Sequence, residues 1–118
     1  MAYVDATNDR LVVAACDDSM CTTATDTILD DGASLFDADI VIGAGGLPVI
    51  GYVMDLQARV AACDDVTCSA AALTTLDADG RMFHPDIAIG ATGNPVMVYH
   101  ENRNADLRFV GCASSTCK

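Results

Sequence analysis

The stretch Asp39-Ile40-Val41-Ile42-Gly43-Ala44-Gly45-Gly46-Leu47-Pro48-Val49-Ile50-Gly51-Tyr52 decides the fold, because the chain contains it twice. It recurs without a gap, 47 residues later, as Asp86-Ile87-Ala88-Ile89-Gly90-Ala91-Thr92-Gly93-Asn94-Pro95-Val96-Met97-Val98-Tyr99. Self-similarity at a period of about 20–50 residues is typical of proteins built from stacked structural repeats. The chain is therefore a tandem repeat.

The similarity extends on both sides of this stretch. The segments that end at Cys16, Cys63 and Cys112 match one another, and Leu29-Asp30 matches Leu76-Asp77. Nearly every residue belongs to a copy. We interpret the chain as one repeat domain of about two and a half copies: a partial copy at 2–37, a full copy at 38–85 and a partial copy at 86–118.

The repeat unit predicts four short strands. In the middle copy these are residues 40–42, 49–53, 59–63 and 71–76, with the glycine-rich turn 43–47 between the first two. Strands of this length separated by Gly and Asp turn residues indicate an all-β fold. Proline precedes the second strand, which is a position that a strand tolerates.

These residues resemble a blade repeat of multi-repeat bacterial β-propeller proteins. The resemblance lies in the Ile-Ala-Ile-Gly strand at 87–90, the Gly-x-Pro-Val turn at 93–96 and the Cys-Asp-Asp segment at 63–65, and the repeat extends it over nearly the whole chain. It implies antiparallel four-stranded blades that act as a scaffold, and it implies no particular activity. The unit length also agrees with the size of propeller blades.

The strand count predicts association between chains. Residues 2–5 match a second strand, and the chain ends just after a third strand, so the expected pattern is three strands, then four, then three. A closed propeller needs at least four blades. We therefore expect a partial propeller completed by a head-to-tail homodimer with six blades. A higher oligomer, a piece of a longer protein and a monomeric ten-stranded sandwich are the alternatives.

Composition narrows the classes of partner. Of 17 acidic residues only Glu101 is a glutamate, and the net charge is −11. Asp favours turns where Glu and Lys favour helices. An acidic chain without a basic stripe is not expected to bind nucleic acid or an anionic membrane surface. It also lacks an apolar run long enough for a transmembrane helix, and residues 1–5 do not resemble a signal peptide.

Six cysteines form three pairs of identical spacing, namely Cys16 with Cys21, Cys63 with Cys68, and Cys112 with Cys117. We predict three local disulfides, each across a hairpin, with free thiols and a metal site as the alternatives. Disulfides indicate an oxidising, extracytoplasmic compartment. Together with the missing signal peptide, they suggest a truncated gene, a lost leader or a cytoplasmic protein with reduced pairs.

The most distinctive polar loop follows the second strand of the last copy. His100, Glu101 and Arg103 there offer a base, an acid and a guanidinium, which could bind a small anion or a sugar. An exposed loop without a ligand is the alternative. No nucleophile with a nearby base is evident, so we predict no catalytic residues. Tyr3, Tyr52 and Tyr99 recur in register and are expected to pack between blades.

Aspartates beside glycine suggest one further ligand. Asp77 and Asp79 could hold calcium, although the spacing lacks the closing glutamate of an EF-hand and Asp-initiated turns explain the same residues. We predict no other cofactor and no resident metal.

The sequence thus indicates a non-catalytic, propeller-type scaffold or binding module that assembles with itself, and it does not indicate which small molecule or protein it binds. An enzyme resembling the propeller hydrolases, with a site at the channel mouth, is the first alternative. A captured gene fragment without a dedicated activity is the second.

Overall fold

The computed structural model describes residues 1–117 and consists of ten strands joined by turns. The strands are β1 (Ala2–Asp5), β2 (Arg10–Cys16), β3 (Ala24–Asp31), β4 (Leu35–Ile42), β5 (Pro48–Met54), β6 (Gln57–Cys63), β7 (Ala71–Asp77), β8 (Met82–Ile89), β9 (Pro95–Glu101) and β10 (Asp106–Gly111). Lys118, the last residue of the predicted partial copy 86–118, lies outside the described residues.

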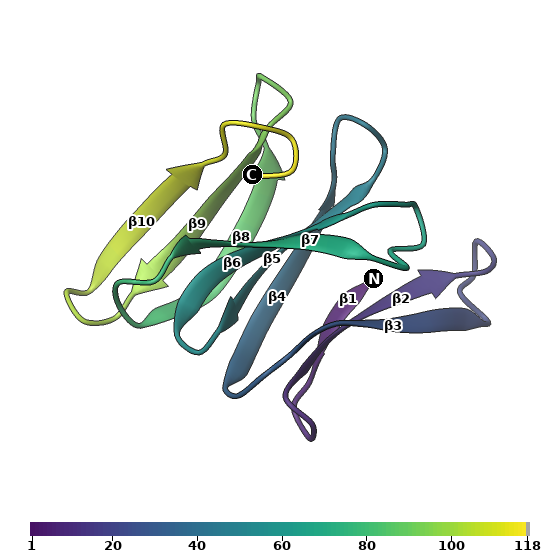
Figure 1. Cartoon of the computed structure of the whole chain (residues 1–118), viewed down its shortest axis with the longest axis horizontal. Coiled ribbons are helices and arrows are strands. Elements are labelled where there is room, and N and C mark those ends of the chain that lie inside the picture. The colour runs from purple at the N-terminus through teal and green to yellow at the C-terminus, as the bar shows by residue number, and fades with distance from the viewer. Residues whose placement is uncertain (118) are drawn as a thin grey trace.

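Consecutive strands pair antiparallel and form three separate sheets (Figure 1). We call them the first sheet (β1-β2-β3), the middle sheet (β4-β5-β6-β7) and the last sheet (β8-β9-β10). The predicted all-β fold and the strand pattern of three, four and three are confirmed.

The turns follow the expected chemistry. β5 and β9 begin at Pro48 and Pro95, and the preceding turns place Gly46 and Gly93 at φ 77° and 83°. Only glycine adopts this left-handed conformation at no steric cost, so the glycines of the repeated stretch set the hairpin. The prediction that proline opens the second strand is confirmed.

The first strand of the middle copy is longer than predicted, and so is the first strand of the last copy. β4 begins at Leu35, whereas the sequence predicted a strand from residue 40. The pairing of β4 with β5 shifts register between Leu35 and Ala38, and β8 shifts in the same way between Phe83 and Asp86. An irregular segment of this kind lets the strand continue through aspartates that read as turn residues. Phe36 and Phe83 stabilise it, with ring centroids 5.3 Å apart.

Two hydrophobic cores lie at the boundaries between sheets. One joins the first and middle sheets and contains Leu11, Val13, Leu35, Ile50, Tyr52, Met54, Ala61, Cys63 and Cys68. The other joins the middle and last sheets and contains Val49, Val53, Ala58, Val60, Met82, Ile87, Met97, Tyr99 and Cys117. The middle sheet is therefore buried on both faces, and each terminal sheet covers only one of them.

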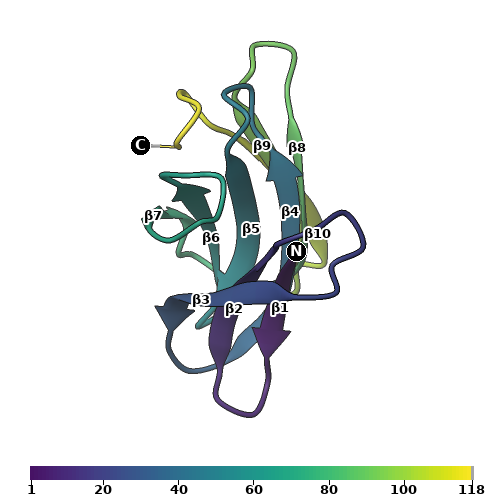
Figure 2. The same cartoon turned by 90° about the vertical axis from the view of Figure 1, so that its right-hand side faces the viewer.

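The three sheets stand in a row. β4 contacts β1 on one side and β8 on the other, and Figure 2 shows these three strands along the same side of the molecule. The described residues form an open row of sheets, not a closed ring, with extents of 43 × 37 × 22 Å. No helix with the length and apolar character needed to cross a membrane occurs among them.

Candidate functional site

The boundary between the first and middle sheets is closed by a polar triad. Tyr52 of β5 donates a hydrogen bond of 2.6 Å from its hydroxyl to Oδ2 of Asp30, at the end of β3. Arg59 of β6 lies opposite Tyr52 in the ladder and donates from Nη1 to the same oxygen at 3.3 Å. One carboxylate thus links two strands of the following sheet.

The same triad recurs at the second boundary. Tyr99 of β9 donates to Oδ2 of Asp77 at 2.7 Å, and Arg108 of β10 donates to it from Nη1 at 2.8 Å. Arg108 also donates to the backbone carbonyl of Asp79 at 3.3 Å. We call each set of Asp, Tyr and Arg a latch, because it fixes the last strand of one sheet, β3 or β7, to the second and third strands of the next sheet.

The residues of each latch shift one another's pKa values. Burial alone would raise the pKa of Asp77, but hydrogen bonds from the Asp79 amide, Tyr99 and Arg108 outweigh it, so the pKa lies below the ordinary value. Burial and the neighbouring carboxylate raise the pKa values of Tyr52 and Tyr99. At neutral pH each tyrosine therefore stays protonated and remains a donor.

Each sheet has two distinct faces, which we name by the tyrosine. The leading face carries the tyrosine and points to the preceding sheet, and the trailing face is the opposite one. On the trailing face of the middle sheet, Ala58 and Val60 are completely buried beneath the last sheet. Gly51 lies on this face too, and a Cβ added there would stand 3.2 Å from Cβ of Ile87. Ile87 of the last sheet therefore packs directly on the backbone of Gly51.

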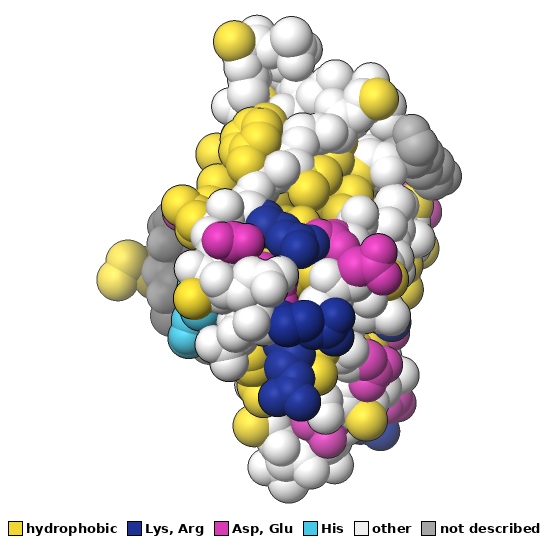
Figure 3. All heavy atoms as spheres, turned by 90° about the vertical axis from the view of Figure 1, so that its left-hand side faces the viewer, with side chains coloured by type: hydrophobic (Ala, Val, Ile, Leu, Met, Phe, Trp, Pro, Cys, Tyr) yellow, Lys and Arg dark blue, Asp and Glu magenta, His cyan; other side chains and the backbone are white. Residues whose placement is uncertain are grey.

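The trailing face of the last sheet is uncovered. Its residues Leu107 and Phe109 correspond to Ala58 and Val60, 49 positions earlier, yet their exposed fractions are 76% and 67%. Val98 lies opposite Phe109 in the ladder and continues the apolar surface. Figure 3 faces the β10 side of the molecule and shows hydrophobic side chains above a central group of arginines. A surface that is core in one copy is solvent-exposed in the next.

No described sheet packs on the leading face of the first sheet, at the other end of the row, and this face is partly exposed although Val12 within it is only 5% exposed. Tyr3 and Ile28 on this face are 38% and 51% exposed. Val12, opposite Tyr3 in the ladder, stands where the other two copies have the latch arginine. The Tyr3 hydroxyl donates to Asp26 of its own sheet at 3.2 Å. This leading face thus lacks the cation of a latch.

The structure does not bring the three predicted binding residues together as one cluster. His100 and Glu101 are consecutive in β9 and point to opposite faces of the last sheet. His100 is partly exposed on the trailing face, and Arg103 is exposed in the loop that follows. Binding of an anion or sugar by these residues stays a prediction.

Glu101 organises its own loop. Its carboxylate is completely buried and accepts backbone hydrogen bonds from Arg103 at 2.7 Å, Asn104 at 3.0 Å and Arg81 at 3.4 Å. Burial alone would raise its pKa, but these donors outweigh burial and lower it. The carboxylate that the sequence offered as a ligand is engaged in holding the loop.

The predicted calcium ligands lie beside a latch. Asp77 binds Tyr99 and Arg108 through Oδ2 and accepts from the Asp79 amide through Oδ1 at 2.9 Å. A calcium ion at Asp77 would have to compete with the Arg108 guanidinium. Within residues 1–117 no group of three or more His, Cys, Asp or Glu side chains is placed to hold a metal ion.

The three predicted disulfides are present, with Cα–Cα distances of 4.8, 4.9 and 4.8 Å for the pairs at Cys16, Cys63 and Cys112. Asp65 shapes the middle loop, since its carboxylate accepts from the backbone and hydroxyl of both Thr67 and Ser69. These hydrogen bonds lower its pKa. Three disulfides indicate an oxidising, extracytoplasmic setting.

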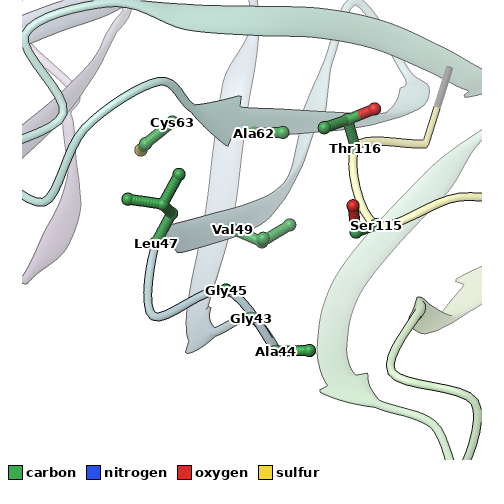
Figure 4. A pocket seen from close by; sticks show the side chains of 9 residues that line it. All are labelled: Gly43, Ala44, Gly45, Leu47, Val49, Ala62, Cys63, Ser115 and Thr116. Carbon is green, nitrogen blue, oxygen red and sulfur yellow. The ribbon is translucent and has the colours of Figure 1, made fainter.

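A small cavity of about 70 Å³ lies between the middle and last sheets (Figure 4). The turn from β4 to β5 and the end of β6 line one side, and Ser115 and Thr116 of the last disulfide loop line the other. It holds neither a charged residue nor a histidine. Its lining offers no acid or base for catalysis.

Sequence reasoning missed the latches. The recurrence of tyrosine indicated packing between units, and Tyr52 and Tyr99 do lie at the sheet boundaries. The aspartate that each tyrosine binds is 22 residues away in the preceding copy, so nothing local connects the two. The signal was present, however, because Asp30 recurs as Asp77 and Arg59 as Arg108.

No family model, curated protein or solved structure matches this chain. The resemblance to propeller blades therefore stays a prediction. What the structure establishes is the coarser fact of an all-β fold with three antiparallel sheets of three or four strands.

Proposed function

We propose that the chain is a non-catalytic, self-associating repeat module whose copies stack head to tail, with the trailing face of the last sheet on the leading face of the first sheet of a second copy. The observation behind the proposal is the exposure of Leu107 and Phe109 at positions that are completely buried in the middle sheet. The next sheet covers this face in the first sheet and in the middle sheet. A second copy supplies that sheet by the same geometry.

The charges at the two free faces agree with this pairing. The last sheet has no strand equivalent to β7 among the described residues, so it offers no latch aspartate to a following sheet. The first sheet has Val12 in place of the latch arginine. An arginine there would be buried without its carboxylate, which is costly. Within residues 1–117 the last sheet thus lacks the aspartate of a latch, and the first sheet lacks the arginine that would need that aspartate as its partner.

Two chains joined at both ends would form six sheets, enough for a closed propeller. A ring of this kind removes the exposed apolar faces that would otherwise promote aggregation. The assembled module then serves as a scaffold, with its turns and loops available for partners. This proposal assigns no reaction to the chain.

Light scattering at several concentrations tests self-association. The chain should have twice its monomer mass, and Phe109→Asp, which places a charge on the trailing face, should shift the mass to that of a monomer. Leu73→Asp is the matched control, because Leu73 is a half-exposed apolar residue of β7 in the middle sheet. A monomer at all concentrations, or equal behaviour of the two variants, would contradict the proposal.

A further inference from the structure

The first sheet lacks one strand that both other sheets have. β5 pairs with β4 along the edge that faces away from β6, and β9 pairs with β8 along the edge that faces away from β10. β1 corresponds to β5 and β9, yet among the described strands it pairs only with β2. One edge of β1 is therefore an open site for strand pairing.

Backbone groups point into this open edge. Met1 and Ala14 exchange two backbone hydrogen bonds, of 2.9 and 2.8 Å. Hydrogen-bonded and non-hydrogen-bonded pairs alternate in an antiparallel ladder, so the next residues, Ala2 and Val4, direct their N–H and C=O groups away from β2. An edge of this type is a template for a further strand.

An apolar cavity adjoins the same edge. It measures about 340 Å³ and lies between Ala15 and Cys16 of the first sheet and Ile40, Ile42 and Pro48 of the middle sheet. At the next boundary, the cavity beside the equivalent residues Ala62 and Cys63 measures about 70 Å³, and the turn from β4 to β5 lines it. The first sheet has no described segment in that place.

The contacts at the second boundary also indicate one side chain that a strand beside β1 would carry. At the second boundary, Asp39 of β4 accepts a hydrogen bond of 3.0 Å from the backbone N–H of Ile87 in β8. Ile40 is the equivalent of Ile87. Gly43 and Leu47 form a hydrogen-bonded pair, and such pairs alternate along the ladder, so the N–H of Ile40 points away from β5 to the open side of β4. Within residues 1–117 this N–H has no carboxylate acceptor. An aspartate on a strand beside β1 would supply one.

We infer that the edge of β1 binds an extended segment of another polypeptide with the pattern of β4, in which an aspartate opposite Ala2 is followed by consecutive apolar residues. Main-chain hydrogen bonds to Ala2 and Val4 provide the pairing. The aspartate bonds to the Ile40 amide, and the apolar residues fill the cavity. This site does not depend on stacking between copies, since the trailing face of the last sheet takes no part in it.

The experiment adds a labelled, end-capped peptide with the sequence of Leu35–Ile42 to the full chain. Fluorescence anisotropy measures binding, and amide hydrogen exchange locates it. We expect saturable binding that slows exchange at Ala2, Val4 and Ile40. Two peptide variants serve as matched controls, Asp39→Ala and a peptide N-methylated at Asp39, which loses the main-chain donor that faces Ala2.

The alanine peptide should bind about tenfold more weakly, as expected for loss of a charged hydrogen bond, and should leave the Ile40 amide unprotected. The N-methylated peptide should bind more weakly still, because it cannot complete the ladder. Absence of binding at millimolar peptide would overturn the inference. So would binding that protects neither Ala2 nor Val4, or that is insensitive to N-methylation.

Discussion

Asp30 and Asp77 each receive hydrogen bonds from a tyrosine and an arginine of the following sheet. These contacts are the only polar side-chain links that recur at both described boundaries. They were not predictable from local sequence, because the bonded residues are 22 to 31 positions apart. The recurrence of each residue could be read from the repeat, but which three meet depends on how the sheets stack.

Replacing Tyr99 with Phe should lower the free energy of unfolding by about 1–2 kcal/mol, since Asp77 loses a donor in a partly buried place. Tyr52→Phe should have a similar effect at the other boundary. Urea denaturation measures both. Tyr3→Phe is the control, because Tyr3 is partly exposed and bonds only to Asp26 of its own sheet. An equal loss for Tyr3 and Tyr99 would refute a special role for the latch.

The lowered pKa of Asp77 predicts a pH dependence. A carboxylate whose pKa is lower in the folded than in the unfolded chain stabilises the fold above its unfolded pKa, about 4. That contribution disappears as the pH falls through the folded value. Asp77→Asn should therefore destabilise the chain near pH 7 and weaken the decline of Tm below pH 4. Thermal scans from pH 7 to 2 provide the measurement, and parallel curves for the two proteins would be evidence against this assignment.

Among the elements, the hairpins were the most predictable. Proline, glycine and cysteine positions specified where β5 and β9 begin and which cysteines pair, because these residues act through local geometry. The start of β4 was not predictable, since its first residues are held by a shifted register and by the contact between Phe36 and Phe83. Tertiary packing there overrides the turn preference of Asp37 and Asp39.

Two of the three disulfides should differ in their effect on stability. Removing the pair Cys63 and Cys68 by alanine substitution should cost about 2 kcal/mol for the lost loop constraint and about 1 kcal/mol more for lost packing, because both side chains are buried between sheets. The pair Cys16 and Cys21 is exposed and serves as the control, with the first cost only. Chemical denaturation compares the two. The prediction fails if the exposed pair is the costlier one to remove.

For the whole molecule, we expect self-association through the trailing face of the last sheet and the leading face of the first sheet. The repeat allowed the count of strands per sheet to be predicted, and the open row agrees with it. The predicted ring could not be settled from the sequence, because closure depends on the angle between successive sheets. That angle arises from packing such as the contact of Gly51 with Ile87, and no short motif encodes it.

Self-association predicts that thermal stability depends on protein concentration. A folded dimer that dissociates on unfolding gains stability by mass action, so Tm should rise by about 3 °C for each tenfold increase in concentration. Differential scanning calorimetry from micromolar to millimolar protein measures this shift. The Phe109→Asp variant should show no such rise. A concentration-independent Tm in the unmodified chain would speak against a dimer of this kind.

The latch has a consequence for how such a gene can change in length. Each latch joins the fourth strand of one copy to the second and third strands of the next, and its three residues occupy equivalent positions in both. A recombination event that duplicates or deletes the middle copy, residues 38–85, therefore leaves every boundary with a complete set of partners, because that copy contains Tyr52, Arg59 and Asp77. The number of sheets can thus change by one in a single step, without compensating substitutions at the latches.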